Sequence, residues 1–140
     1  MTRTNRKRIV YAISSSFFMF IVWMIYTANT GGHSILFELV GAIPYGDKLG
    51  HILLFGLLTL CANFTLNFAT IKLSLRSFEP RLYKGSLLVI VFVLLEEGTQ
   101  YYIPTRTFDI YDILADGLGI GMFTFISYLC HKRCSAPSTT

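Results

Sequence analysis

Charged residues are scarce in this chain of 140 residues. Asp, Glu, Lys and Arg together make up 14% of the sequence, whereas 53% of it is hydrophobic. This composition excludes an ordinary soluble domain, and the length is too short for two of them. The sequence also lacks internal repeats, low-complexity tracts and linkers, so we expect one domain over residues 1–140. Only three cysteines are present, and we expect no disulfide among them.

What the sequence contains instead is a series of four long apolar segments, each bounded by turn or charge signals. A helix of about twenty residues is ~30 Å long and matches the hydrocarbon core of a bilayer. We therefore predict an all-α integral membrane bundle of four transmembrane helices, at about residues 9–27, 48–68, 85–102 and 108–130. Residues 28–46 form an interfacial loop, because their apolar part is too short to span the membrane.

The distribution of Lys and Arg favours one orientation in the membrane. These residues concentrate in the amino-terminal head, in the polar loop 70–84 and in the carboxy-terminal tail, whereas the other side holds only Lys48 and Arg106. This positive-inside bias predicts that both termini are cytoplasmic. Because the net charge of +4 arises from the segments that flank the helices, it does not indicate nucleic-acid binding.

Ionisable groups interrupt the apolar pattern in the stretch LEEGTQYYIPTRTFDIYDILADGLG, residues 95–119. Glu96, Glu97 and Gln100 share one face at the end of the third predicted helix. Three aspartates follow at positions i, i+3 and i+7 on one side of the fourth helix, and these are Asp109, Asp112 and Asp116. A charge near the middle of a bilayer costs ~2.5–3.5 kcal/mol on insertion scales, so this stretch indicates a functional site.

The predicted topology brings these polar groups to one place. The second helix enters from the outer face with Asp47, Lys48 and His51, the third helix ends at that face, and the fourth begins there. Six of the eight acidic residues therefore meet in the outer half of the membrane, with Lys48 and Arg106 as the nearby cations. Because charges are costly in a low dielectric, these carboxylates must be protonated, paired, hydrated or bound to a cation.

Three interpretations of this cluster stay open. The first is a site for a divalent cation such as Mg²⁺, Mn²⁺ or Zn²⁺, with oxygen and imidazole ligands from Asp47, His51, Glu97, Asp112 and Asp116. The second is a buried ion-pair network. It would join Arg106 to Asp109 or Asp112, and Lys48 to Glu96 or Glu97.

The third interpretation is a metal-free site that binds a polar headgroup or performs catalysis. The candidate catalytic residues are Glu97 as a general base, His51 as its partner, and Asp112, with Arg106 holding a phosphate. The complete set of candidate ligand-binding residues is Asp47, Lys48, His51, Glu96, Glu97, Gln100, Arg106, Asp109, Asp112 and Asp116.

Small residues in the fourth predicted helix indicate a contact between helices. Gly117 and Gly121 are four positions apart, with Ala115 nearby. Small residues at this spacing let another membrane helix approach closely. We therefore predict that Gly117 and Gly121 lie against a neighbouring helix.

The order DKxxH followed by ExxQxxxPxRxxDxxDxxxDxxG over residues 47–119 resembles the signature of the VanZ-like family of small bacterial membrane proteins. Members of that family are linked to resistance to the glycopeptide teicoplanin, which acts at the cell envelope. The resemblance implies a multi-pass protein of the bacterial plasma membrane. Asp116 stands where the family usually has asparagine, which adds a charge to the cluster. The resemblance does not imply a particular reaction.

Three functions from different classes follow. The first is a binding or protective module for a cell-envelope lipid headgroup, a lipid-linked envelope precursor or the cationic part of a glycopeptide. The second is a membrane-embedded hydrolase or transferase that acts on a lipid-linked substrate. The third is a small transporter or structural membrane protein, for which an oligomer could complete a path.

Overall fold

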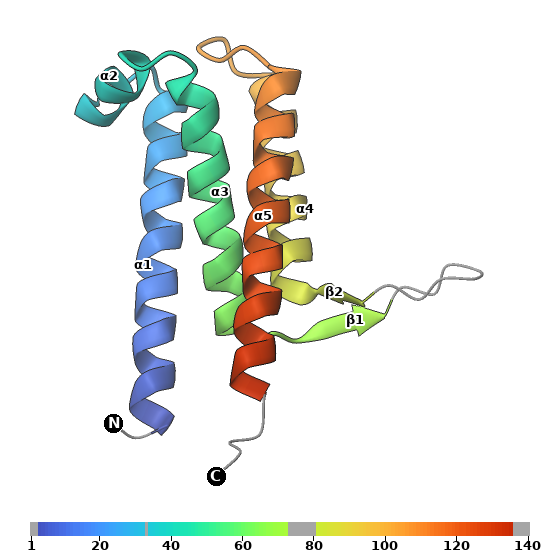
Figure 1. Ribbon diagram of the computed structural model, residues 1–140. Helices are drawn as coiled ribbons and strands as arrows, with labels where there is room; N and C mark the ends of the chain where they lie inside the picture. Colours follow the sequence, from blue (N-terminus) through green and yellow to red (C-terminus); the bar gives the residue numbers. More distant parts are fainter. Residues whose placement is uncertain (1–2, 33, 73–80, 136–140) are drawn as a thin grey trace, which may run out of the picture.

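The computed structural model describes residues 3–32, 34–72 and 81–135, with side chains from residue 4 to residue 133 within these ranges. This part of the chain forms five helices and one two-stranded antiparallel sheet. Their bounds in chain order are α1 Arg3–Asn29, α2 Ile35–Gly41, α3 Gly46–Thr65, β1 Thr70–Lys72, β2 Arg81–Tyr83, α4 Lys84–Gln100 and α5 Ile110–Ser135. The four longer helices run side by side, with α2 at one end and the sheet and both termini towards the other (Figure 1).

Three of the described helices are long and apolar enough to cross a membrane: Thr4–Asn29, Gly46–Thr65 and Ile110–Arg133. The burial of side chains agrees with this. Large apolar side chains such as Leu95 and Phe125 are exposed, whereas Glu97 and Asp116 are 1% and 0% exposed. Water would meet an extensive apolar surface, which soluble proteins avoid, whereas lipid would cover it favourably. The chain is therefore an all-α membrane protein.

The third predicted transmembrane helix, expected at about residues 85–102, ends two residues earlier, at Gln100. It appears as α4, which has 17 residues and at 1.5 Å per residue is only ~25 Å long, below the ~30 Å hydrocarbon core. The first helix is longer than predicted, because the basic head forms its first turns from Arg3 onwards. The fourth, α5, likewise extends to Ser135.

Both predicted loops contain regular structure. Within the loop 28–46, Ser34 begins α2 as its N-cap, because its Oγ accepts a hydrogen bond from the backbone N–H of Leu36 at 3.3 Å. Within the loop 70–84, β1 and β2 pair with Thr70 opposite Tyr83 and Lys72 opposite Arg81. The sequence did not predict either element, because each is too short to show a period.

Helix α3 lies at the centre of the fold and contacts α1, α2, α4 and α5. A cluster of buried apolar side chains surrounds it, made of Ile21, Phe55, Leu58, Val89, Val93 and Ile120. Helices α3 and α5 approach closely at Gly119 of α5, where an added Cβ atom would lie 2.3 Å from the carbonyl oxygen of Ile52. Helix α5, which carries Asp112 and Asp116, therefore packs directly against α3.

The predicted roles of Gly117 and Gly121 are wrong. Both are exposed, and a Cβ atom added at either position meets no atom within 4 Å. Successive residues on a helix differ by about 100° in direction, so the face that carries Gly119 differs from the one that carries Gly117 and Gly121. Only Gly119 of these three lies at the contact with α3.

Polar side chains fix the three central helices to one another toward the end that carries the sheet. The Asn63 side chain of α3 donates hydrogen bonds to Ser86 Oγ of α4 at 3.0 Å and to Ser127 Oγ of α5 at 3.1 Å. It also accepts one from the backbone N–H of Ser86 at 3.1 Å. Cross-helix hydrogen bonds of this kind add to packing within a membrane, so they fix the spacing of α3, α4 and α5 at this end.

Basic and acidic groups occupy opposite ends of the bundle. The basic first turns of α1 lie at the end of the two termini, where the sheet carries Arg81 (Figure 1). The acidic residues of α3 and α5 begin their helices at the opposite end. This separation is what the topology predicted, while the assignment of the basic end to the cytoplasm stays a prediction. Arg76, which belongs to the predicted basic loop, lies outside the described residues.

Candidate functional site

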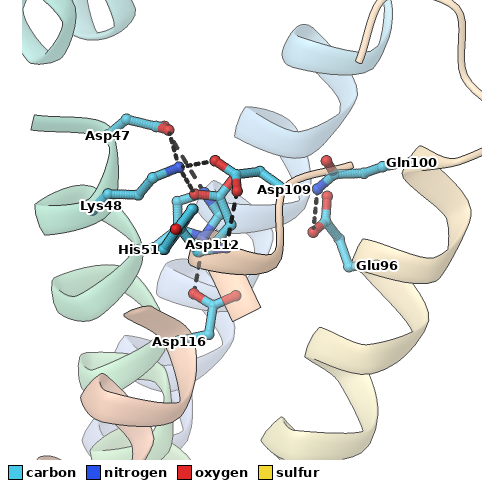
Figure 2. A network of polar contacts seen from close by, with 9 residues as sticks. Asp47, Lys48, His51, Glu96, Gln100, Asp109, Asp112 and Asp116 are labelled. Carbon is cyan, nitrogen blue, oxygen red and sulfur yellow. Dashed lines mark hydrogen bonds and ion pairs between the residues drawn. The ribbon is translucent and has the colours of Figure 1, made fainter. Parts of the chain in front are cut away.

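The start of α5 positions the first acidic residues of the site. Asp109 precedes the helix, and its Oδ1 accepts a hydrogen bond from the backbone N–H of Tyr111 at 2.9 Å. Asp is a favoured N-cap because its carboxylate satisfies a free N–H group in the first turn. Asp112 and Asp116 then follow on the side of α5 that faces α3 (Figure 2).

Lys48 in the first turn of α3 binds three carboxylates. Its Nζ lies 2.6 Å from Asp109 Oδ2 and 3.2 Å from Asp47 Oδ2, and it also donates a hydrogen bond to Asp112 Oδ1 (Figure 2). The hydrogen bond from Lys48, together with the one from the Tyr111 N–H, lowers the pKa of the Asp109 carboxyl below its ordinary value. One ammonium group therefore neutralises part of a larger negative charge.

His51 lies one turn further along α3 and connects two levels of the site. Its Nδ1 is 2.9 Å from Oδ1 of Asp116, which is completely buried. Its Nε2 faces the other way, 3.9 Å from Oδ1 of Asp47 and 3.9 Å from Oδ1 of Asp112. When Asp116 is ionised, its oxygen accepts the hydrogen bond and the Nδ1 atom carries the proton.

The end of α4 supplies two glutamates with different surroundings. Glu96 Oε2 accepts a hydrogen bond from Gln100 Nε2 at 3.0 Å, and this pair lies apart from the Lys48 cluster (Figure 2). Glu97 is 1% exposed, and neither of its carboxylate oxygens has a hydrogen-bond partner in the described part of the chain. The same holds for Oδ2 of Asp116. Three buried carboxylate oxygens are thus left without a donor.

Two overlapping groups of side chains have the geometry to hold a metal ion. One consists of Asp47, His51 and Asp112, and the other of His51, Glu97 and Asp116. In each group, one ligand atom from every residue lies within 4.8 Å of the others. All five residues predicted as metal candidates belong to one of these groups, and His51 belongs to both.

The ion pairs predicted for a buried network differ from those observed. Arg106 forms no ion pair in the described part of the chain, and its Nε is buried without a hydrogen-bond partner. Lys48 binds aspartates and neither Glu96 nor Glu97. The reason is that α3 packs most extensively on α5. Lys48 therefore lies beside Asp109 and Asp112 and occupies the position next to these carboxylates that was predicted for Arg106.

Arg106 lines a groove of about 110 Å³ between α1, α2 and α3. The lining of this groove combines apolar side chains with charged ones. The apolar wall consists of Ile21, Met24, Ile25 and Ala28 of α1, Phe37 and Val40 of α2, and Leu54 and Phe55 of α3. The polar edge consists of Asp47, His51, Glu96 and Arg106, and Gly50 also lines the groove. The groove is therefore amphipathic.

Two larger hollows lie toward the opposite end of the molecule. One has a volume of about 310 Å³ and is lined by residues that include Arg6, Lys7 and Phe68. The other has a volume of about 420 Å³ and is lined by residues that include Arg81 and Lys132. Neither contains a residue of the acidic cluster or an unpartnered buried group, so the amphipathic groove is the better candidate.

The structure brings most of the predicted site residues together. A single network joins Asp47, Lys48, His51, Asp109, Asp112 and Asp116. Glu97 lies next to the His51–Asp116 pair, whereas Glu96 and Arg106 line the groove and Gln100 pairs only with Glu96. The apolar wall from α1 and α2 was not predicted, because its residues look like any lipid-facing residues in the sequence.

Comparisons with known proteins give one relative of no established function. No protein-family model matches the chain, and no solved structure matches it. The chain is similar to an uncharacterized protein, C11E3.10, of Schizosaccharomyces pombe, with 32% identity over 117 residues. The match covers 82% of this chain and 64% of that protein, so the chain spans less than two thirds of its relative. The VanZ-like resemblance therefore stays a prediction, and the function must be argued from the site.

Proposed function

We propose that this chain is a VanZ-like integral membrane protein whose amphipathic groove binds the polar headgroup of a membrane lipid. The observation that carries the proposal is the lining of the groove, which combines an apolar wall from α1, α2 and α3 with the charged residues Asp47, Glu96 and Arg106. A membrane lipid likewise combines a charged headgroup with apolar acyl chains. The lining of the groove therefore matches the chemistry of a lipid where its headgroup joins its acyl chains.

The charged groups of the groove suit a headgroup that carries both a phosphate and an amine. The Arg106 Nε is a buried donor without an acceptor in the described part of the chain, and a guanidinium group binds phosphate oxygens well. Asp47 and Glu96 line the same groove and are acceptors for an ammonium group. A zwitterionic headgroup would thus satisfy groups of both signs.

The size of the groove limits what it can hold. Its volume of about 110 Å³ is well below the ~300–1,000 Å³ of pockets that enclose a drug-sized ligand. A whole glycopeptide therefore does not fit, whereas a headgroup fits if its acyl chains lie outside, along the exposed apolar surface of α1. If the protein contributes to glycopeptide resistance, it does so through an envelope lipid or lipid-linked precursor, or through a small cationic part of the antibiotic.

The proposed arrangement in the membrane is the four-helix bundle with both termini in the cytoplasm. In this arrangement α4 also spans the membrane, in addition to α1, α3 and α5. Its short length is accommodated by local thinning of the bilayer. The groove then opens in the outer leaflet of a bacterial plasma membrane, where envelope precursors are exposed.

Binding is supported better than catalysis by the positions of the candidate catalytic residues. Glu97, the candidate general base, does not line the groove, so it is not placed to reach a bound headgroup. Asp112 is already bonded to Lys48. The hydrolase or transferase alternative would require Glu97 to move to the groove and Asp112 to be released from Lys48.

The test is to identify and quantify the lipids that stay bound during purification. We expect the wild-type protein to retain a lipid with a phosphate and an amine, and Arg106→Gln to retain at least ~10-fold less, as the loss of a charged hydrogen bond implies. The matched control is Arg81→Gln, which makes the same change in β2 at the other end. Equal retention by Arg106→Gln and Arg81→Gln would overturn the proposal.

A further inference from the structure

We infer that His51, Glu97 and Asp116 form a binding site for a divalent transition-metal ion, for which Zn²⁺ is the best fit. One residue comes from each of the three central helices, α3, α4 and α5. The inference goes beyond lipid binding and does not depend on it, because Glu97 and Asp116 do not line the groove.

The distances among the three side chains fit a single ion. One ligand atom from each residue lies within 4.8 Å of the other two, and Nδ1 of His51 is already 2.9 Å from Oδ1 of Asp116. Zinc bonds of ~2.0–2.2 Å place tetrahedral ligand atoms roughly 3.3–3.6 Å apart. A small movement of the side chains therefore converts the observed arrangement into a coordination shell.

Unpartnered carboxylate oxygens give the independent reason to expect a cation. Both oxygens of Glu97 and Oδ2 of Asp116 are buried without a hydrogen-bond partner in the described part of the chain. An uncompensated buried carboxylate costs several kcal/mol. Glu97 also lies in the last turn of α4, where the helix dipole is negative and opposes a further negative charge. A bound cation would remove all of these costs together.

Lys48 does not provide that cation, and its position separates the two candidate metal groups. Its ammonium group binds Asp47, Asp109 and Asp112. A metal ion held by Asp47, His51 and Asp112 would thus lie beside a positive charge and compete for the same oxygens. Asp47 is also 68% exposed in its side chain, which favours hydration over coordination. The group with Glu97 and Asp116 has neither disadvantage.

The donor atoms indicate which class of ion binds. An imidazole nitrogen with carboxylate oxygens suits Zn²⁺ and similar transition metals, whereas Mg²⁺ and Ca²⁺ prefer oxygen ligands alone and more of them. Three protein ligands leave one tetrahedral position for water. Binding would replace the hydrogen bond between His51 and Asp116, so the ion would displace a proton whenever the imidazole Nδ1 is protonated.

The experiment is a titration of the purified protein with Zn²⁺ alone, after chelation and without a polyhistidine tag. We expect one zinc ion per chain and a rise in the melting temperature of the wild-type protein. Glu97→Gln and Asp116→Asn should each weaken zinc binding by ~10-fold or more. Asp47→Asn should bind zinc as the wild type does, because Asp47 belongs only to the other group.

The melting temperature of the metal-free protein gives a second test, because it shows whether the charge of Glu97 destabilises the protein when no cation is bound. Glu97→Gln removes an unpartnered charge, so the metal-free variant should be at least as stable as the metal-free wild type, and zinc should stabilise the wild type and Asp47→Asn more than Glu97→Gln. If the variants do not fold, the visible absorption spectrum of the wild-type protein with Co²⁺ tests the inference instead. Co²⁺ bound to these ligands should give the absorption of a tetrahedral site. No zinc bound by the folded wild type, or equal zinc binding by Glu97→Gln, would overturn the inference. Loss of zinc in Asp47→Asn alone would overturn it too.

Discussion

The Nζ atom of Lys48 lies 2.6 Å from Oδ2 of Asp109, so a cation in the first turn of α3 binds the residue that begins α5. Asp109 thereby has two roles, because its other carboxylate oxygen accepts the N–H of Tyr111 in the first turn of α5. The ionised carboxyl group of Asp109 holds the start of α5 against α3. This contact sets the position of Asp112 and Asp116 relative to His51.

The contact predicts how stability responds to acid. The bonds from Lys48 and Tyr111 lower the pKa of Asp109, and His51 of α3 also favours its ionised form. The stabilisation is therefore complete above the unfolded pKa of about 3.9 and is lost as the pH falls through the lower folded pKa. Asp109→Asn should be less stable than the wild type at pH 6, and the difference should become smaller as the pH falls below about 3.9. Thermal unfolding in detergent at several pH values measures this.

The control for the acid experiment is Glu38→Gln on α2, which removes an exposed carboxylate. It should change the melting temperature little at any of these pH values. A difference between Asp109→Asn and the wild type that stays the same from pH 6 to acid pH would contradict the account, because a protonated aspartate carries no charge, as asparagine does.

Replacing the cation of the Lys48 cluster should destabilise the fold. Lys48→Met leaves the buried Asp112 without its ammonium partner. Breaking a fully buried pair costs ~3–5 kcal/mol, and the 27% exposure of the Lys48 side chain reduces the expected loss to ~1–3 kcal/mol. Adding Asp112→Asn should restore part of this loss. Lys84→Met, at an exposed position in α4, is the control, and an equal effect of the two lysine variants would refute the role of Lys48.

The contact between α3 and α5 can be tested with glycine variants. At Gly119 an added Cβ atom would meet the backbone of Ile52 at 2.3 Å, and backbone atoms cannot rotate away. Gly119→Ala should therefore destabilise the protein by ~1–3 kcal/mol. Gly121→Ala, which adds the same atom in open space, should be neutral or slightly stabilising. Denaturant titration of both variants measures the difference, and similar stabilities would contradict the observed packing.

The sequence predicted the long helices well because the apolar segments and the charged residues that bound them carry the same information. It was less reliable at the ends of helices. The third helix was expected at about residues 85–102 but ends at Gln100, and the fourth was expected from about residue 108 but begins at Ile110. The seven residues of α2 are too few for a periodic pattern, so they were expected as part of a loop.

The candidate site shows the same limits. Helical spacing alone placed Asp109, Asp112 and Asp116 on one face of α5, opposite Lys48 and His51. Spacing could not show which carboxylate Lys48 binds, because that depends on how closely α3 and α5 pack at Gly119. Nor could it show that Arg106 turns into a groove. That groove exists only where α1 and α2 fold against α3.

The most direct test of lipid binding fills the groove without changing its charges. Gly50 lines the groove, and a Cβ atom added there meets no atom within 4 Å. Gly50→Leu should thus fold normally and occupy the space of the headgroup. Gly121→Leu is the matched control, since it adds the same side chain at an exposed position of α5 where an added Cβ also meets open space.

Native mass spectrometry of the wild-type protein and these two variants is the decisive measurement. We predict that the wild type and Gly121→Leu carry a bound lipid at the same occupancy, and that Gly50→Leu carries little or none. A wild-type protein without lipid, or a Gly50→Leu variant that keeps the lipid in full, would contradict the proposal that this groove binds a headgroup.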